Sequence, residues 1–249
     1  MREDLIYGIH AIQHLLNSKP EQFLELHIQD THDNKSLLSL ASLAKTLGVN
    51  VSGVSKKQLD QWLPERNHQG VAAKVRLQPL LTEDDFSTLI DACDKPPLFL
   101  ILDGVQDPHN LGACLRTADA VGVTAVIIPK DRSASLTPVV RKVASGAAET
   151  VPVVQVTNLV RAIEMLKKLG VWIMGTSMQT TQSLYQVDLK GSVAIVLGAE
   201  GTGLRRLTEE HCDVLMQIPM MGVVESLNVS VAAGVCLYEA TRQRLNKVD

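Results

Sequence analysis

The second half of the chain alternates continuous apolar runs with segments of helical periodicity. The apolar runs predict strands at residues 98–102, 124–128, 151–156, 171–175, 193–197 and 214–218. Because these runs are apolar throughout and helical segments separate them, they predict a parallel sheet covered by helices on both faces. The last predicted helix, 227–245, is apolar through most of its first half, which is typical of a helix buried in its own domain or against a partner.

The first part of the chain predicts a smaller α/β unit. Helices are expected at 8–17, 36–47 and 55–63, and strands at 23–28, 49–54 and 70–77. Residues 78–97 then change character, with prolines at both ends, acidic residues between them and a short helix expected over 83–92. We therefore predict an N-terminal domain (1–77), an acidic linker (78–97) and a C-terminal domain (98–249).

Composition narrows the possible functions. A hydrophobic fraction of 45% excludes disorder for the chain as a whole, and an aromatic fraction of 3% argues against a surface that stacks the bases of a single strand. The net charge of −3 gives no support for a strong nucleic-acid binder. Basic residues nevertheless gather around Arg132 and Lys142 and at Arg205 and Arg206. Each cluster is either a solvated face or a patch that faces RNA.

Metal chemistry, secretion and membrane insertion find no support in the sequence. The cysteines are widely spaced without a Cys-x-x-Cys pair, which predicts reduced thiols and neither a zinc site nor a disulfide framework. His10 and His14 lie four positions apart on a predicted helix, but no third ligand accompanies them, so no metal is expected. The start of the chain has no signal pattern, and no apolar run approaches membrane-spanning length. We expect a cytoplasmic protein that binds neither membrane nor DNA.

Three segments of the predicted C-terminal domain carry the candidate chemistry. In residues 102–116, 195–204 and 218–230, an apolar run leads into a turn with glycine or proline and then into helix-favouring sequence. Because loops at the carboxyl ends of parallel strands form the ligand crevice, these turns predict one composite site. The turn 198–203 has the order G-x-x-G-x-G, which disfavours a dinucleotide site. A tight turn without a ligand is the alternative there.

Among the polar residues of these segments, Arg116 and Glu200 stand out. Arg116 follows a predicted helix start among small and apolar residues, which predicts a buried guanidinium that needs a carboxylate or phosphate partner. A purely structural salt bridge with Glu200 is the alternative to a catalytic role. His109 is either a general base or a satisfied turn residue. Ser226 is expected to be the N-cap of the last helix, since no nucleophile elbow surrounds it.

The same three segments resemble the signature motifs of the SpoU (TrmH) branch of the SPOUT methyltransferases. The likeness rests on Asn-x-Gly followed by Arg116, on Gly-Ala-Glu-Gly-x-Gly at 198–203 and on Ser-Leu-Asn-Val-Ser at 226–230. It extends over residues 98–245. The segments Tyr-Gly-Ile-His-Ala-Ile-Gln-His-Leu-Leu at 7–16 and His-Gln-Gly-Val-Ala-Ala at 68–73 are similar to bacterial members that methylate the ribose of a guanosine in 23S rRNA.

This resemblance implies a fold, a cofactor and partners. The parallel sheet would carry a deep trefoil knot, in which the C-terminal segment threads a loop, and the N-terminal domain would bind RNA. The chain would act as a homodimer whose active sites are completed near the interface. S-adenosylmethionine would bind in the knot against the second and third segments. The residues implied at that site are Gly198, Ile218 and Leu227 in contact with the cofactor, with Gly201, Met220 and Ser226 close by.

The implied reaction moves the methyl group of S-adenosylmethionine to a ribose 2′-hydroxyl in 23S rRNA, free or in an assembling large ribosomal subunit. Arg116 would stabilise the developing alkoxide or pass its proton onward, and Glu200 would hold Arg116 by charge-assisted hydrogen bonds. Asn110 and Asn228 would orient the arginine or the substrate. A tRNA 2′-O-ribose methyltransferase shares these motifs and stays an alternative, as does a non-catalytic RNA-binding assembly factor.

Overall fold

The computed structural model describes residues 2–30, 34–77 and 80–245. Two compact units are present, one formed by residues 1–79 and 136–150 and the other by residues 80–135 and 151–249. Among the described helices, none is long and apolar enough to cross a membrane.

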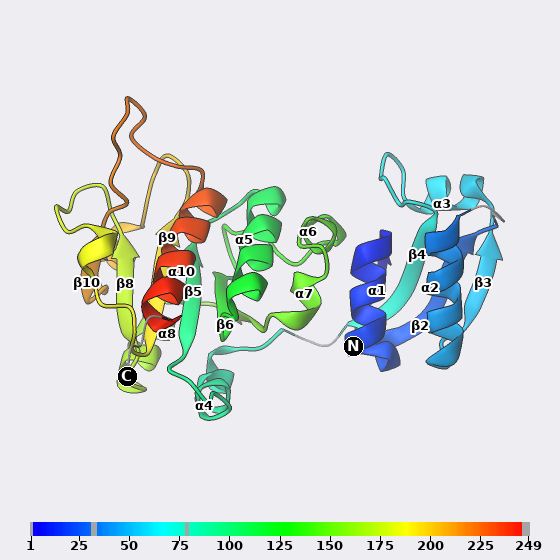
Figure 1. Ribbon diagram of the computed structural model, residues 1–249, viewed down its shortest axis with the longest axis horizontal. Coiled ribbons are helices and arrows are strands. Elements are labelled where there is room, and N and C mark those ends of the chain that lie inside the picture. Colours follow the sequence, from blue (N-terminus) through cyan, green and yellow to red (C-terminus); the bar gives the residue numbers. More distant parts are fainter. Residues whose placement is uncertain (1, 31–33, 78–79, 246–249) are drawn as a thin grey trace. The chain divides into compact units, whose positions relative to one another are not determined.

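A six-stranded sheet is the centre of the larger unit, with the strand order β10-β8-β9-β5-β6-β7 in the part of the chain that the structure describes (Figure 1). The strands are β5 (Leu98–Asp103), β6 (Ala125–Pro129), β7 (Val153–Val156), β8 (Trp172–Thr176), β9 (Val193–Gly198) and β10 (Val214–Met216). Every neighbouring pair is parallel. The parallel sheet predicted from the apolar runs is confirmed, and each strand overlaps its predicted range.

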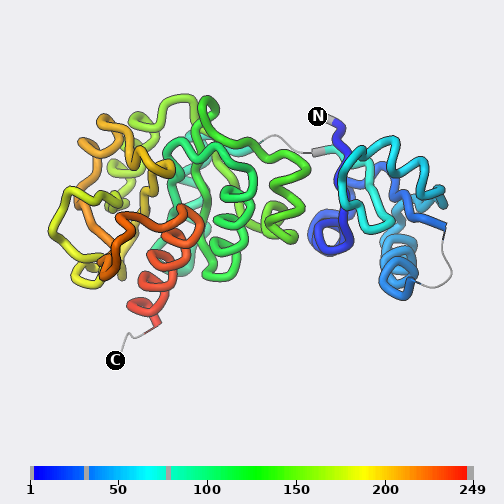
Figure 2. Tube along the Cα trace, turned by 90° about the horizontal axis from the view of Figure 1, so that it is seen from above, coloured from blue at the N-terminus to red at the C-terminus, as the bar shows by residue number. Residues whose placement is uncertain are grey.

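Helices cover both faces of this sheet. On one face α5 (Pro108–Val121) and α10 (Val229–Leu245) lie side by side, as Figures 1 and 2 both show. On the other face α8 (Leu159–Lys168) packs against a buried cluster that includes Phe99 and Ile101 of β5. Side chains alternate along a strand, so the intervening residues of β5 point toward α5 and α10. Two short elements, η3 (Leu184–Gln186) and α9 (Arg206–Glu210), lie in the connections around β9.

The expected linker packs onto the core of the larger unit from Leu80 onward. It contains η2 (Glu83–Asp85) and α4 (Phe86–Asp91), and Leu81 forms a parallel bridge with Val154 of β7. The Phe86 side chain is only 1% exposed, and its ring lies edge-on to that of Phe99 with 6.3 Å between centroids. Burial of Phe86, together with the packing of Leu81, Leu89 and Ile90 against the same cluster, attaches this acidic segment to the sheet.

Local signals in the sequence set the ends of α5. The side chain of Asp107 accepts a hydrogen bond from the backbone N–H of His109 at 2.8 Å, and Pro108 occupies the first helical turn, where its missing N–H costs nothing. At the other end Gly122 adopts the left-handed conformation with φ of 71°. These signals place Asn110 in the first turn of α5, beside the carboxyl end of β5.

The described residues of the smaller unit form a mixed four-stranded sheet with helices, and the strand order is β1-β4-β2-β3. Its strands are β1 (Arg2–Tyr7), β2 (Phe23–Gln29), β3 (Val51–Val54) and β4 (Val71–Leu77). Its helical elements are α1 (Ile9–Ser18), η1 (Pro20–Gln22), α2 (Lys35–Thr46), α3 (Lys56–Trp62), α6 (Pro138–Val143) and α7 (Ala147–Thr150). The sequence did not predict β1.

Candidate functional site

The first and second signature segments meet where two adjacent strands end. Asp103, the last residue of β5, pairs directly with Gly198, the last residue of β9. The connection from β10 at the sheet edge, residues 217–228, leads to the start of α10, which packs against α5 and β9. All three segments therefore arrive at the carboxyl end of the sheet, where open α/β folds bind their ligands.

Glu200 is the residue at which the three segments join. Its Oε1 accepts hydrogen bonds from Asn110 Nδ2 at 3.2 Å, from the backbone N–H of Val229 at 3.3 Å and from Asn228 Nδ2. Asn228 Nδ2 also donates to Asn110 Oδ1 at 3.0 Å. A carboxylate that accepts several hydrogen bonds orients the groups that donate to it, so Glu200 fixes both amides. The structure thus brings together Asn110, Glu200 and Asn228.

Asn228 also caps α10, which corrects the prediction made for Ser226. The Oδ1 of Asn228 accepts from the backbone N–H of Ser230 at 3.0 Å and of Val231 at 3.4 Å. The helix begins at Val229, so Asn228 occupies the N-cap position and Ser226 lies two residues before it, exposed in the connection. Asparagine is as good an N-cap as serine. The cap ties the orientation of the Asn228 amide to the start of α10.

Arg116 is exposed on α5 and is not among the hydrogen-bond partners of Glu200 in the described residues, so the predicted pair of the two is absent. Helix geometry explains the difference. Six positions after Asn110, Arg116 lies roughly 9 Å further along the helix axis and about 120° around it. The first turn of α5 faces Glu200, while Arg116 faces outward with its guanidinium available to a ligand.

Close backbone packing explains the glycine at the end of β9. A Cβ on Gly198 would lie 2.0 Å from the backbone carbon of Gly203, far closer than atoms can approach. An antiparallel bridge joins Ala199 to Gly203, and Gly201 and Gly203 have positive φ angles of 77° and 66°. The turn therefore folds back on the strand end and carries Glu200.

The residues implied for S-adenosylmethionine line the connections around this turn. Ile218, Met220 and Leu227 are half-buried in the segment between β10 and α10, and Ser226 is exposed. Met221 and Val223 in the same segment are 97% and 99% exposed. Apolar side chains beside a glycine turn that a ligand can approach closely suit an adenosine and a methionine chain. The residues present fit the cofactor.

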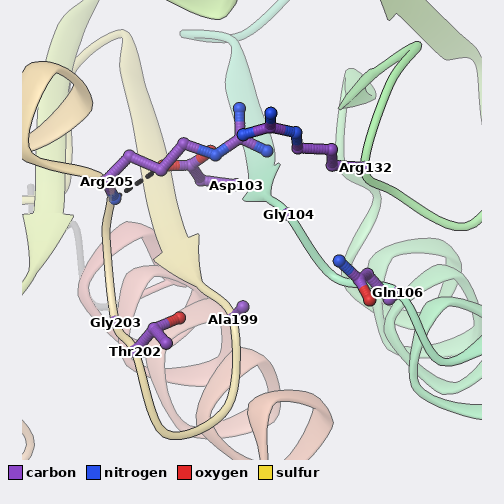
Figure 3. Close-up of a pocket in the computed structure, with 8 residues that line it drawn as sticks. All are labelled: Asp103, Gly104, Gln106, Arg132, Ala199, Thr202, Gly203 and Arg205. Atoms are coloured by element: carbon purple, nitrogen blue, oxygen red, sulfur yellow. Dashed lines mark hydrogen bonds and ion pairs between the residues drawn. The ribbon is translucent and has the colours of Figure 1, made fainter.

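A shallow pocket between the ends of β5 and β9 adds charged residues that the sequence analysis did not assign to the site (Figure 3). The side chain of Asp103 is fully buried, and its Oδ2 accepts from the backbone N–H of Arg205 at 2.9 Å. The Arg205 Nε lies 3.3 Å from Asp103 Oδ1. Arg132 reaches the pocket from the opposite wall. The local signals were the basic clusters at Arg132 and Arg205 and the carboxylate of Asp103, which ends an otherwise apolar run.

The described residues near the site include neither a low-pKa thiol nor a cluster of metal ligands. Burial raises the pKa of Cys114 and of Cys236 to about 12, which keeps both thiols protonated at neutral pH. Among the described residues, no group of three or more His, Cys, Asp or Glu side chains could hold a metal ion. What the site offers is amide donors, a carboxylate, guanidinium groups and backbone, which suit the binding and alignment of a polar, anionic substrate.

Known protein families and known relatives match nearly the whole chain. The SpoU rRNA Methylase family matches residues 97–238, and the RNA 2′-O ribose methyltransferase substrate binding family matches residues 5–80. The 23S rRNA (guanosine-2′-O-)-methyltransferase RlmB of Vibrio vulnificus is 51% identical over 245 residues, which are 98% of this chain and 99% of the relative. The protein of the same name from Shewanella oneidensis is 53% identical over 243 residues, 98% of each chain.

Solved structures agree in fold. The SpoU methyltransferase AviRb from Streptomyces viridochromogenes, crystallised with AdoMet, superposes with a TM-score of 0.81 at 23% identity, over 98% of this chain and 91% of that one. A crystal structure described as an RNA 2′-O ribose methyltransferase gives 0.78 at 26% identity, over 98% and 90% of the two chains. On the strength of the family match over 97–238 and of full-length relatives at half identity, this chain belongs to the SpoU rRNA methylase family.

Proposed function

We propose that this chain transfers a methyl group from S-adenosylmethionine to the ribose 2′-hydroxyl of a guanosine in 23S rRNA. The observation that carries the proposal is the junction of Asn110, Glu200 and Asn228, which joins the three signature segments at the carboxyl end of the sheet. The RlmB relatives, about half identical over almost their full length, bear the name of this reaction.

The protein has to align the methyl donor with its acceptor rather than activate the donor. S-adenosylmethionine, when bound, supplies a methyl group on a sulfonium that is already a good leaving group. The protein has to place the 2′-oxygen in line with that methyl group and support the charge that develops as the hydroxyl proton leaves. Glu200 holds the amides of Asn110 and Asn228 in fixed positions, so that they orient the ribose without reorganising.

Arg116 supports the developing alkoxide. Its side chain is exposed and is not among the hydrogen-bond donors to Glu200. A guanidinium stays protonated at any ordinary pH, so its role is electrostatic: it stabilises the oxygen anion and holds the neighbouring phosphate. The chain acts as a homodimer. Each active site is completed near the dimer interface, where the exposed face of α5 that carries Arg116 lies.

The turn 198–203 and the connection 217–228 would hold the cofactor. Backbone groups of Gly198 and Gly201 would bind its polar groups, and the half-buried side chains of Ile218 and Leu227 would contact its apolar surface. Met220 and Ser226 lie in the same connection. This connection runs from the edge strand β10 back to α10, and it is the segment that would thread a trefoil knot.

The N-terminal unit captures RNA. The substrate-binding family matches residues 5–80, which contain the mixed sheet of β1 to β4. A structure described as a TrmH/SpoU tRNA modifying enzyme matches only 66% of this chain, at 32% identity and a TM-score of 0.57. The additional N-terminal unit favours 23S rRNA, free or in an assembling large subunit in the cytoplasm, over tRNA, with no part for DNA.

Transfer of labelled methyl from S-adenosylmethionine to unmodified 23S rRNA and, separately, to unmodified tRNA tests this proposal. Label in 23S rRNA alone is the expected result. Label in tRNA alone would keep the reaction and overturn the substrate. If neither free RNA is labelled, precursor large-subunit particles are the next substrate, and failure there as well would favour an RNA-binding assembly factor without turnover.

A further inference from the structure

We propose that Arg132 and Arg205 form a binding subsite for a phosphodiester group of the RNA substrate, in the pocket between the ends of β5 and β9. This inference rests on the proposed function and deepens it by naming the part of the substrate that the pocket takes. Figure 3 shows the Arg132 and Arg205 side chains extending toward each other from opposite sides of the pocket that Asp103 also lines.

Charge balance indicates an anion. Two guanidinium groups share the pocket with a single lining carboxylate, that of Asp103, whose side chain is fully buried. Asp103 pairs with Arg205, and its Oδ1 lies 3.3 Å from Arg205 Nε. Arg132 has neither a hydrogen bond nor an ion pair with the described residues. One further negative charge would neutralise the pocket, and a phosphodiester carries one such charge on two oxygens that match the donor fork of arginine.

The backbone of Arg132 is held in a costly conformation that aims the side chain. Its φ of 56° lies in the left-handed region, which costs a residue other than glycine about 1 kcal/mol or more. Two hydrogen bonds fix the loop that carries it: the backbone N–H of Ala134 donates to the carbonyl of Val105 at 2.8 Å, and Ser133 Oγ donates to the same carbonyl at 3.1 Å. The loop after β6 is thereby tied to the loop after β5.

Because the pocket adjoins the turn that carries Glu200, the phosphate bound there would be one next to the reacting ribose. Ala199, Thr202 and Gly203 line it, and they belong to the same turn that holds Glu200. Arg205 is 44% exposed and Arg132 is exposed, so a polymer backbone can reach both groups from solvent. Thr202 and Gln106 add neutral hydrogen-bond donors at the rim. A strand whose ribose lies beside Asn110 and Asn228 would bring a backbone phosphate here.

The decisive variant is Arg132→Gln, with Arg161→Gln as the matched control. Arg161 is an exposed arginine of α8 outside this pocket, so the control makes the same change of charge elsewhere on the larger unit. Binding of an unmodified 23S rRNA transcript is measured over a range of KCl concentrations. For Arg132→Gln we expect about tenfold weaker binding, and a slope of log K against log[KCl] that is reduced by about 0.7 to 0.9. Arg132→Lys should recover part of the loss.

A glycine variant and the affinity for S-adenosylmethionine distinguish an RNA phosphate subsite from a site for the carboxylate of the methyl donor. Arg132→Gly relieves the left-handed strain, so it should keep the fold intact and still lose RNA affinity. The Kd for S-adenosylmethionine should stay unchanged in Arg132→Gln and Arg132→Gly. Wild-type RNA affinity and salt slope in Arg132→Gln would overturn the inference, and a selective loss of S-adenosylmethionine affinity would assign the pocket to the carboxylate of the methyl donor. The binding readout needs no turnover, so absence of methyl transfer would count against the proposed function alone.

Discussion

Glu200 Oε1 accepts a hydrogen bond from Asn110 Nδ2 at 3.2 Å, although ninety positions separate the two residues in the chain. The same oxygen accepts from Asn228 Nδ2, and the two amides are joined to each other at 3.0 Å. One carboxylate oxygen therefore fixes groups at the start of α5 and at the start of α10. Because both helices begin at the carboxyl end of the sheet, small shifts of either helix would change the active-site geometry.

Replacing Asn228 should affect stability, and replacing Ser226 should not. Asn228→Ala removes the side chain that caps α10, and loss of an N-cap costs about 1 kcal/mol of unfolding free energy. Ser226→Ala removes an exposed side chain outside the helix and should change stability by less than about 0.5 kcal/mol. Urea unfolding of the two variants measures both effects. Equal losses would mean that the cap does not reside in Asn228.

Replacing Arg116 should slow methyl transfer by orders of magnitude and leave binding of the cofactor nearly unchanged. Removal of one group that stabilises a developing oxyanion typically lowers a rate by about 10² to 10³. Since Arg116 is exposed and is not a partner of Glu200, Arg116→Ala should leave folding and S-adenosylmethionine binding nearly unchanged. Single-turnover transfer and calorimetric binding of the cofactor are the measurements. A variant that transfers methyl at the wild-type rate would remove Arg116 from the mechanism.

The glycine that ends β9 should tolerate no side chain. In Gly198→Ala the new Cβ would overlap the backbone of Gly203, so the turn that carries Glu200 must open. We expect a loss of about 1 to 3 kcal/mol in stability and of most cofactor affinity. Gly191→Ala is the control, because nothing lies within 4 Å of its Cβ position. Thermal melts with and without S-adenosylmethionine would show the difference, and full cofactor stabilisation of Gly198→Ala would refute this role of the turn.

Alkaline pH should destabilise the protein through its buried thiols. Burial raises the pKa of Cys114 from 9.0 to about 12 and raises that of Cys236 equally. The unfolded chain therefore loses these protons first, so the stability is fully present below pH 9 and falls between about pH 9 and 12. Unfolding free energies measured from pH 7 to 10.5 should decline less steeply in Cys114→Ala than in the wild type. Parallel curves would show that another group controls alkaline unfolding.

The strands of the larger sheet were predictable because a buried parallel strand is apolar over its whole length. The first strand of the smaller unit escaped prediction because Glu3 and Asp4 interrupt any apolar pattern, while its partner β4 supplies the pairing. The stretch after residue 79 resembled a linker because prolines flank it and acidic residues dominate its first half. Phe86, Leu89 and Ile90 pack against the sheet, but such a short apolar face does not show which domain it will contact.

The spacing of residues along the sequence predicted only part of the site. The motifs identified Asn110, Glu200 and Asn228, but helix periodicity did not settle that Arg116 would face solvent, because small alanines lie on both sides of α5. Asp103 and Arg205 are 102 positions apart, and only the adjacent ends of β5 and β9 bring them together. Sheet topology, and not sequence distance, creates that pocket.

The position of the transferred methyl group tests the central claim most directly. Unmodified 23S rRNA is methylated with labelled S-adenosylmethionine and hydrolysed in alkali, which cannot cleave next to a 2′-O-methylated ribose. We expect all label in alkali-resistant dinucleotides that begin with a 2′-O-methylated guanosine, at a single site. Label released in mononucleotides would place the methyl group on a base and contradict the account.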